Sequence, residues 1–229
     1  MKSIIKALCP EVCPGCGKVV KEIGLCKDCI DRFKYIKQPI CGICGRTMEE
    51  DGFCCLDCKK IKHYFKRNVS VFEYRGDIKE CIYRFKYANM RCYAEFFAEE
   101  AIKRYSKLLK LWKIDVIVPV PMYKPKQRKR GYNQAEEFAK ALGKACGIKV
   151  DAKLLNRARD TVPMKTLSKQ QRYENLLSAF SVNKNRPTYK RVLVVDDIFT
   201  TGSTIDACAR VLRENGVEVV YGMCIASGS

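Results

Sequence analysis

The sequence predicts an α/β fold with a central, mainly parallel sheet and a small cysteine-rich domain at the N-terminus. Two aliphatic runs predict the sheet, at residues 192–195 and 114–121, because each precedes a polar or basic loop and then a helical pattern. Such runs are typical of parallel strands that are buried on both faces. The third observation is that ten of the fifteen cysteines lie within residues 9–58. We therefore expect a cysteine-rich domain over residues 1–60 and an α/β domain over residues 61–229.

The composition predicts a globular, strongly basic protein. The chain has 229 residues, of which 47% are hydrophobic, and 44 lysines and arginines face 25 acidic residues, a formal charge of +19. This charge falls to about +15 if eight thiolates bind two Zn²⁺ ions. The excess attracts polyanions, either nucleic acid or a small ligand with several phosphates, although a basic surface without a ligand has the same composition.

The N-terminus and the hydrophobic runs predict where the protein resides. The apolar part of residues 1–8 is too short for a signal peptide, and Lys6 interrupts it. The longest apolar run is far shorter than a membrane span. We therefore expect a cytoplasmic protein without a transmembrane segment.

The N-terminal cysteines form four Cys-x-x-Cys turns, and the first two turns are echoed by the last two. One turn places two sulfurs on one edge of a tetrahedron, and a second turn completes four ligands around Zn²⁺. All ligands are thiolates, so we expect two structural zinc sites. The eight cysteines are Cys13, Cys16, Cys26, Cys29, Cys41, Cys44, Cys55 and Cys58.

Several alternatives stay open for this segment. Turns that are adjacent in sequence could share an ion, or the first and third turns could do so. Cys54 could replace Cys55, although Cys55 keeps the two-residue spacing. A disulfide-rich domain is less consistent with the sequence, since no secretory signal accompanies the cysteines. We expect His63, the single histidine, to be a solvated surface residue because no cysteine pair needs a further ligand.

The middle of the chain predicts a basic connector at 59–68, a strand at 69–74 and helices at about 78–89 and 92–111. After the strand at 114–121 come five basic residues before Gly131, which we expect to form a cationic, anion-binding loop. Asn133 is the expected cap of the next helix. The candidate ligands on the loop are Lys126, Arg128 and Arg130.

Residues 157–175 predict a second cationic segment. Residues 161–163 discourage a continuous helix, and we expect a mobile segment before a helix that starts near Ser168. Lys165 and Arg172 could close over an anionic ligand, although an ordinary basic surface loop has the same composition. Strands are expected at 179–182 and 217–224.

The residues that follow the run at 192–195 combine acids with a hydroxyl-rich bend. We expect the strand to end at Asp196 and Asp197, where two carboxylates suit a sugar diol or the ligand shell of Mg²⁺. The bend precedes a helix whose N-terminus suits a phosphate group, so the two features together describe a ribose 5-phosphate site. Helix capping alone would need one such polar residue and not six. The bend contains Thr200, Thr201, Gly202, Ser203 and Thr204.

All thirteen residues at 192–204 resemble the phosphoribosyl pyrophosphate (PRPP) signature of type I phosphoribosyltransferases. One departure is Phe199, where the signature prefers an aliphatic residue. The side chain at this position does not bind the ligand in the family. The resemblance implies the type I phosphoribosyltransferase fold, PRPP as the ligand with Mg²⁺, and a flexible hood corresponding to the segment at 157–175.

A narrower resemblance covers nearly the whole chain. The cysteine turns, Phe-Lys-Tyr at 85–87, Val-Pro-Val-Pro at 118–121 and Arg-Gly-Tyr-Asn-Gln-Ala at 130–135 resemble the ComF family of bacterial competence proteins. So does the segment 157–180, with Arg172 and Asn175, except that Met164 stands where the family usually has glutamine. The resemblance implies a role in the uptake of transforming DNA and a partner in the competence machinery.

Two functions therefore remain. The first is a Mg²⁺-dependent phosphoribosyltransferase, or a PRPP-binding relative of one, in which Asp196 and Asp197 bind the ribose and stabilise the reacting carbon. The sequence does not identify the acceptor substrate. The second is a non-catalytic accessory protein that binds single-stranded DNA or RNA. In that case Tyr64, Phe65 and Tyr83 are expected to stack on bases.

Overall fold

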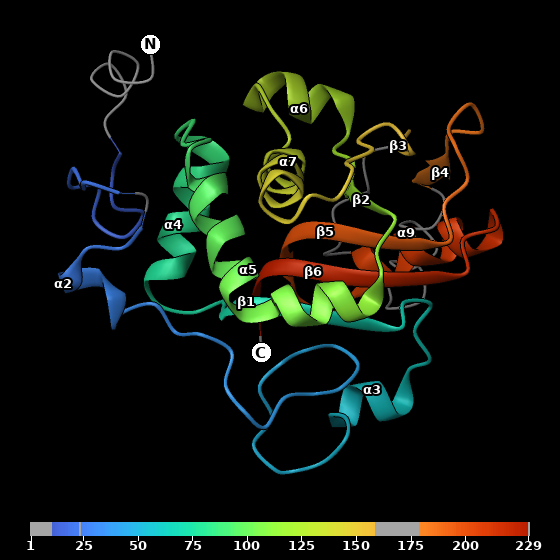
Figure 1. Ribbon diagram of the computed structural model, residues 1–229, viewed down its shortest axis with the longest axis horizontal. Coiled ribbons are helices and arrows are strands. Elements are labelled where there is room, and N and C mark those ends of the chain that lie inside the picture. The colour runs from blue at the N-terminus through green and yellow to red at the C-terminus, as the bar shows by residue number, and fades with distance from the viewer. Residues whose placement is uncertain (1–10, 23, 159–178, 229) are drawn as a thin grey trace, which may run out of the picture.

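The computed structural model describes residues 11–22, 24–158 and 179–228 (Figure 1). Lys165 and Arg172, two of the residues expected to bind an anionic ligand, therefore lie outside the described residues. The rest of the predicted ligands and all eight predicted zinc ligands lie inside them.

The centre of the fold is a four-stranded sheet in which all neighbouring strands are parallel, in the order β1-β6-β5-β2. This arrangement confirms the predicted α/β class. Parallel neighbours need crossovers, and helices between the strands provide them. The strands are β1 (Arg67–Glu73), β2 (Val116–Pro119), β5 (Arg191–Phe199) and β6 (Val219–Ser227).

Helices cover both faces of this sheet. Leu193 and Val195 of β5 belong to one hydrophobic core, and Val192 and Val194 belong to another, because successive side chains of a strand point to opposite faces. The first core includes the aromatic ring of Phe97, and the second lies under α9. The covering helices are α4 (Asp77–Tyr87), α5 (Tyr93–Trp112) and α7 (Gln134–Cys146) on the first face and α9 (Ser203–Glu214) on the second.

One sequence prediction about the middle of the chain was wrong. The residues expected to form a cationic loop before Gly131 form a short helix, α6 (Lys124–Arg130). Lysine, glutamine and arginine have high helix propensity, and a proline in the first turn does not oppose a helix. The remaining short elements are α2 (Lys27–Ile30), α3 (Leu56–Lys60), and the antiparallel pair β3 (Leu155–Arg157) and β4 (Phe180–Val182).

The two halves of the cysteine-rich segment pack on different parts of the α/β layers, as Figure 1 shows. The first half lies beside α4, where the Arg84 guanidinium donates to the carbonyls of Pro14 and Gly15 at 2.7 Å. The second half lies against the start of β1, where the Asn68 side chain donates to the carbonyl of Cys44 at 3.0 Å. Each half is therefore held by hydrogen bonds to the backbone of its cysteine turn.

The described helices include none with the length and apolar character that a membrane crossing requires.

Close packing of β6 against β1 and α9 predicts a strong effect of one methyl group at Gly222. A Cβ atom at Gly222 would lie 2.5 Å from Oδ1 of the buried Asn68 and 3.0 Å from Cγ2 of Ile205. We expect Gly222→Ala to lower the free energy of unfolding by about 1–3 kcal/mol, because neither neighbour can move freely. Urea unfolding, followed by the fluorescence of Trp112, measures this change. The matched control is Gly52→Ala, where a Cβ meets nothing within 4 Å; equal stability of the two variants would contradict the prediction.

Candidate functional site

The acidic pair lies within β5 and not after its end, so the predicted strand boundary was wrong. Pairing with β2 stops at Val195, but pairing with the longer β6 continues to Phe199. Asp196 and Asp197 are therefore held by backbone bonds on one side only, next to the point where β2 ends. This is the carboxyl edge of the parallel sheet, the usual place for ligands in such folds.

Asp197 is buried and is held by two side chains from different helices. Its Oδ2 atom lies 2.9 Å from Nζ of Lys86 on α4 and accepts a hydrogen bond of 2.7 Å from Nε2 of Gln134, the first residue of α7. Arg130 in turn donates to the Gln134 side chain. Sequence reasoning did not assign Lys86 or Gln134 to the site, although both lie in the motifs that carry the ComF resemblance.

The two carboxyl groups differ in their electrostatic environment. Burial and, next, repulsion by Asp197 raise the pKa of Asp196 to about 7, although the Asp197 amide donates to its Oδ1 atom at 2.9 Å. Burial alone would lower the pKa of Lys86, but attraction to Asp197 and Asp196 outweighs it and the pKa lies above its usual value. The site thus combines a charged Lys86–Asp197 pair with a carboxyl group that titrates near neutral pH.

The hydroxyl-rich bend connects the acidic pair to α9. Gly202 has a φ of 79°, and a Cβ atom there would lie 2.5 Å from the Phe199 ring, so the position requires glycine. The hydroxyls of Thr201 and Ser203 lie 2.8 Å apart. Among the described residues, the amides of Thr201 and Gly202 donate to no other group of the chain. The bend therefore offers both hydroxyls and backbone N–H groups to an anion.

The structure brings one of the expected basic ligands to the acidic pair. Arg130 contacts Gln134 and lies over the ring of Tyr87, 4.8 Å from its centroid. Lys126 and Arg128 are exposed on α6. The α6 helix thus carries positive charge beside the carboxyl edge of the sheet, and Arg130 is connected to Asp197 through one glutamine.

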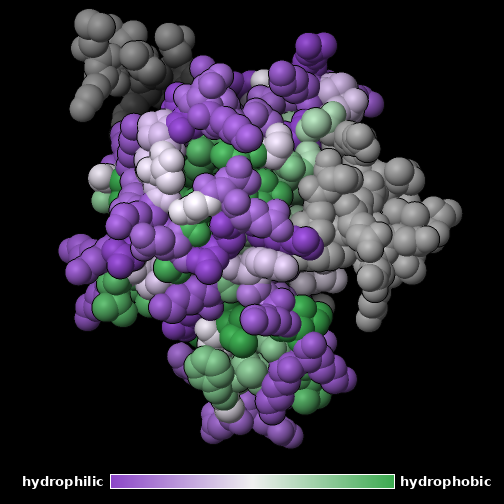
Figure 2. Space-filling view, turned by 90° about the vertical axis from the view of Figure 1, so that its right-hand side faces the viewer, coloured by the Kyte–Doolittle hydropathy of each residue, from purple (hydrophilic) through white to green (hydrophobic). Residues whose placement is uncertain are grey.

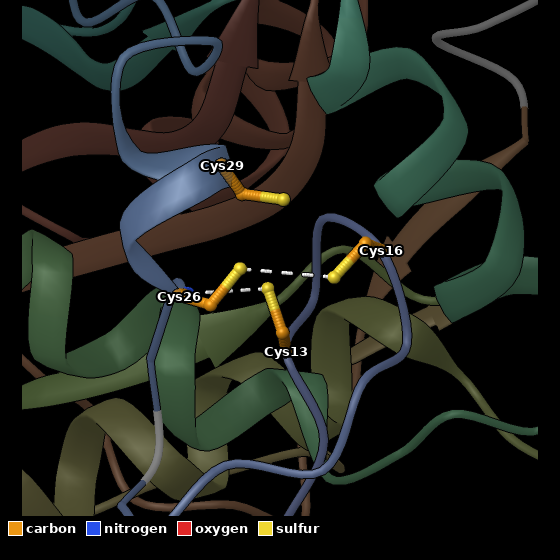
Figure 3. A group of neighbouring side chains, drawn as sticks. All are labelled: Cys13, Cys16, Cys26 and Cys29. Carbon is orange, nitrogen blue, oxygen red and sulfur yellow. Dashed lines mark hydrogen bonds between the residues drawn. The ribbon is translucent and has the colours of Figure 1, made fainter.

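The cysteines form two clusters of four, and each cluster contains two turns that are adjacent in sequence. Cys13, Cys16, Cys26 and Cys29 make up the first cluster, and Figure 3 shows their sulfurs turned toward one another. Cys41, Cys44, Cys55 and Cys58 make up the second. The structure therefore supports the simple pairing over the interleaved one, and Cys55 over Cys54.

The spacing and polarity of these clusters fit Zn²⁺. Sulfurs bound at about 2.3 Å to a tetrahedral zinc lie about 3.8 Å apart, and the Cys16–Cys26 and Cys44–Cys55 sulfur pairs are separated by 3.7 and 3.8 Å. Burial raises the pKa of Cys41, but backbone N–H groups that point at its sulfur outweigh burial and lower the pKa to about 6. At Cys41 the turn thus favours the thiolate form, whereas burial raises the pKa of Cys44 and Cys58 in the same cluster.

Two aromatic residues of the connector differ from expectation. His63 is not a solvated surface residue, because its side chain is only 7% exposed and its Nε2 lies 3.6 Å from Sγ of Cys58. Its ring stacks on Phe65 with a centroid distance of 4.5 Å. Phe65 is itself buried, so it is not an exposed stacking partner for a base. Both residues face inward because the connector packs against α9 and the second cysteine cluster.

Comparisons with known proteins match two separate parts of the chain to two family models. Residues 4–59 match the family model of the double zinc ribbon domain, and residues 96–228 match that of the phosphoribosyl transferase domain. The chain is 33% identical to Competence protein F of Haemophilus influenzae over 209 residues, which cover 86% of this chain and 87% of the relative. It is 30% identical to Competence protein ComFC of Bacillus subtilis over 200 residues, 84% of this chain and 79% of the relative.

A third relative has a name that does not mention competence. DNA utilization protein YhgH of Escherichia coli is 27% identical over 214 residues, which cover 88% of this chain and 89% of the relative. The double zinc ribbon, the phosphoribosyltransferase domain that follows it, and relatives of matching length place the chain in the ComF family.

Proposed function

We propose that this protein binds PRPP together with Mg²⁺ at the carboxyl edge of its sheet and acts in the handling of transforming DNA. The observation that carries the proposal is the placement of two carboxylates and a hydroxyl-rich bend at the same end of β5. The phosphoribosyltransferase match over residues 96–228 and the competence names of the relatives support it.

The site residues have distinct roles in this proposal. The bend at 200–204 binds the 5-phosphate through hydroxyls and N–H groups, and Asp196 and Asp197 accept hydrogen bonds from the ribose hydroxyls. Within the part of the chain that the structure describes, Lys86 and Gln134 both contact Oδ2 of Asp197, so in this proposal Oδ1 accepts a bond from the ligand. Mg²⁺ would neutralise charge on the pyrophosphate group. The basic side chains proposed to bind pyrophosphate are Lys126, Arg128, Arg130, Lys165 and Arg172.

Transfer of the phosphoribosyl group would break the bond between the anomeric carbon and pyrophosphate. Positive charge develops at that carbon in the transition state, and in this proposal the Asp196 and Asp197 carboxylates stabilise it. Lys86 holds the Asp197 carboxylate in place through their 2.9 Å contact. The acceptor that takes the phosphoribosyl group is not identified by any described side chain.

Removing the acidic pair tests PRPP binding. Titration calorimetry with PRPP and Mg²⁺ should detect binding to the wild type, and the double variant Asp196→Asn, Asp197→Asn should bind at least tenfold more weakly, since it loses two charge-assisted hydrogen bonds. The control is Asp115→Asn, because Asp115 caps the start of β5 at the opposite end of the strand. Equal affinity of the wild type and the double variant would remove the carboxylates from the site.

The raised pKa of Asp196 predicts that this residue lowers the stability of the fold by an amount that depends on pH. Its pKa in the folded protein lies above that of the unfolded chain, so the folded state binds more protons between about pH 4 and 7, and stability falls as pH rises through this window. The unfolding free energy of Asp196→Asn minus that of the wild type should therefore increase by about 1–2 kcal/mol from pH 5.5 to pH 7. Above pH 8 this difference should increase little further. Urea unfolding of both proteins at each pH measures the difference. A difference that stays constant or shrinks as pH rises would contradict the assignment.

A second candidate function is binding of single-stranded nucleic acid. An open hollow of about 600 Å³ is lined by Lys62, Tyr64, Lys66 and Arg213, together with two glutamates. Tyr64 is 42% exposed, and the Arg210 guanidinium lies 5.4 Å from its ring centroid. Cations around an aromatic ring suit a base and its phosphate, and the name DNA utilization protein of one relative favours this partner.

Most of the face drawn in Figure 2 is hydrophilic, with smaller hydrophobic groups between the polar side chains. Such a surface is consistent with a polyanionic partner, but also with a soluble protein that lacks one. A protein of the competence machinery is the remaining candidate partner, because the relatives' names connect the family to that process. The nucleic-acid hypothesis therefore depends on a direct measurement.

A salt titration separates these alternatives. If the hollow binds single-stranded DNA, the logarithm of the affinity should fall linearly as the logarithm of salt concentration rises. Tyr64→Ala should weaken binding by roughly 1–3 kcal/mol at every salt concentration, because stacking is lost while the phosphate contacts remain. Fluorescence anisotropy with a labelled oligonucleotide measures both effects. The control is Phe53→Ala, because this aromatic side chain is exposed but does not line the hollow. Absence of binding at low salt would exclude this function.

A further inference from the structure

The two zinc-binding halves are copies of one unit, but one basic position in them has different surroundings. Lys18 and Arg46 each follow the second cysteine of a turn by two positions. Lys18 Nζ lies 3.3 Å from Asp28 Oδ2, and Arg46 Nη1 lies 3.4 Å from Asp57 Oδ2, so both form the same pair within their own half. However, the Lys18 side chain is 70% exposed and that of Arg46 only 18%. Arg46 must therefore have additional neighbours.

The additional neighbour of Arg46 is the hydroxyl-rich bend. Its Nη2 atom donates to the backbone carbonyl of Thr200, the first residue of the bend. The guanidinium also lies 5.8 Å from the ring centroid of Phe199, which contacts Gly202. The planar guanidinium can serve Asp57 and Thr200 with two different nitrogens at once, which suits arginine better than lysine.

A second connection reaches the other end of the bend. Asp206 lies in the first turn of α9 and is buried. Its Oδ1 atom accepts a hydrogen bond of 2.6 Å from the Tyr64 amide and lies 3.4 Å from Nδ1 of His63. Nε2 of the same histidine lies 3.6 Å from Sγ of Cys58, a ligand of the second cluster. Both ends of the bend are thus connected to the second zinc-binding half.

The first zinc-binding half has no comparable connection in the described structure. Its contacts with α4 include the hydrogen bonds from Arg84 to the carbonyls of Pro14 and Gly15 and the ion pair between Arg32 and Asp77. Lys18 pairs with Asp28 of its own half. The two copies of the unit therefore differ in what they touch, and the bend is contacted by the second copy.

We propose that Arg46 is a positioning residue for the bend, and that the second zinc site, unlike the first, orders the bend for an anionic ligand. The inference rests on the proposed function, in which the bend binds the 5-phosphate of PRPP. Thr201 and Gly202 must hold their N–H groups in one direction to bind phosphate, and an unrestrained loop would lose conformational freedom on binding. Arg46 and Asp206 restrain the bend before the ligand arrives.

The test compares Arg46→Gln with the matched variant Lys18→Gln, which removes the corresponding pair from the first half. Hydrogen exchange of peptides within residues 199–207 should be faster in Arg46→Gln than in wild type and unchanged in Lys18→Gln. The affinity for PRPP and Mg²⁺, measured by calorimetry, should fall about tenfold in Arg46→Gln alone, the loss of one charged hydrogen bond. Zinc analysis should find two ions per chain in all three proteins.

The two readouts distinguish the inference from the function on which it rests. If no protein binds PRPP but exchange still rises in Arg46→Gln, the proposed ligand is wrong and the positioning role stands. If PRPP binds and the two variants match the wild type in exchange and affinity, the positioning role is overturned. If Arg46→Gln binds less zinc than the wild type, the variant His63→Phe is used in its place. This change keeps the ring stack on Phe65 and removes the contact with Asp206. Exchange at the wild-type rate in His63→Phe would then overturn the inference.

Discussion

The site depends on how the protein accommodates two adjacent carboxyl groups at the buried edge of a sheet. Neighbouring negative charges in a poorly solvated place repel each other, and the repulsion has to be relieved by a cation or by a proton. The structure uses both routes. Lys86 compensates Asp197 at 2.9 Å, and Asp196 has a pKa raised to about 7, so it is partly protonated near neutral pH.

This constraint explains why residues far apart in the chain converge on one oxygen atom. Oδ2 of Asp197 receives Lys86 from α4 and Gln134 from the start of α7, and Gln134 is bonded to Arg130 at the end of α6. The Asn133 side chain caps α7 by accepting from the Ala135 amide, which places Gln134 at the carboxyl edge. Three helices are thereby oriented around one strand end by charge and hydrogen bonding in addition to apolar packing.

The zinc-binding halves illustrate how a duplicated unit can acquire two structural tasks. Each segment of about thirty residues is too small to form an apolar core of its own, so metal ligation supplies the cohesion. One copy docks on α4, and the other docks on β1 and, through Arg46, on the bend before α9. At the same position of the repeat, Lys18 contacts Asp28 of its own half, whereas Arg46 contacts both Asp57 of its own half and the bend. The guanidinium has enough donors to serve both.

The sequence by itself determined the local features of this protein. Aliphatic runs predicted the parallel strands, the spacing of the cysteines predicted four turns with thiolate ligands, and Asn133 was recognised as a helix cap, because each of these depends on residues that are close in the chain. Only the tertiary structure decided which turns share a cluster, that β5 runs past its acids along the longer β6, and that His63 lies inward. It also decided the partners of Asp197. Those outcomes depend on atoms brought together from distant segments, for which local periodicity and propensity carry no information.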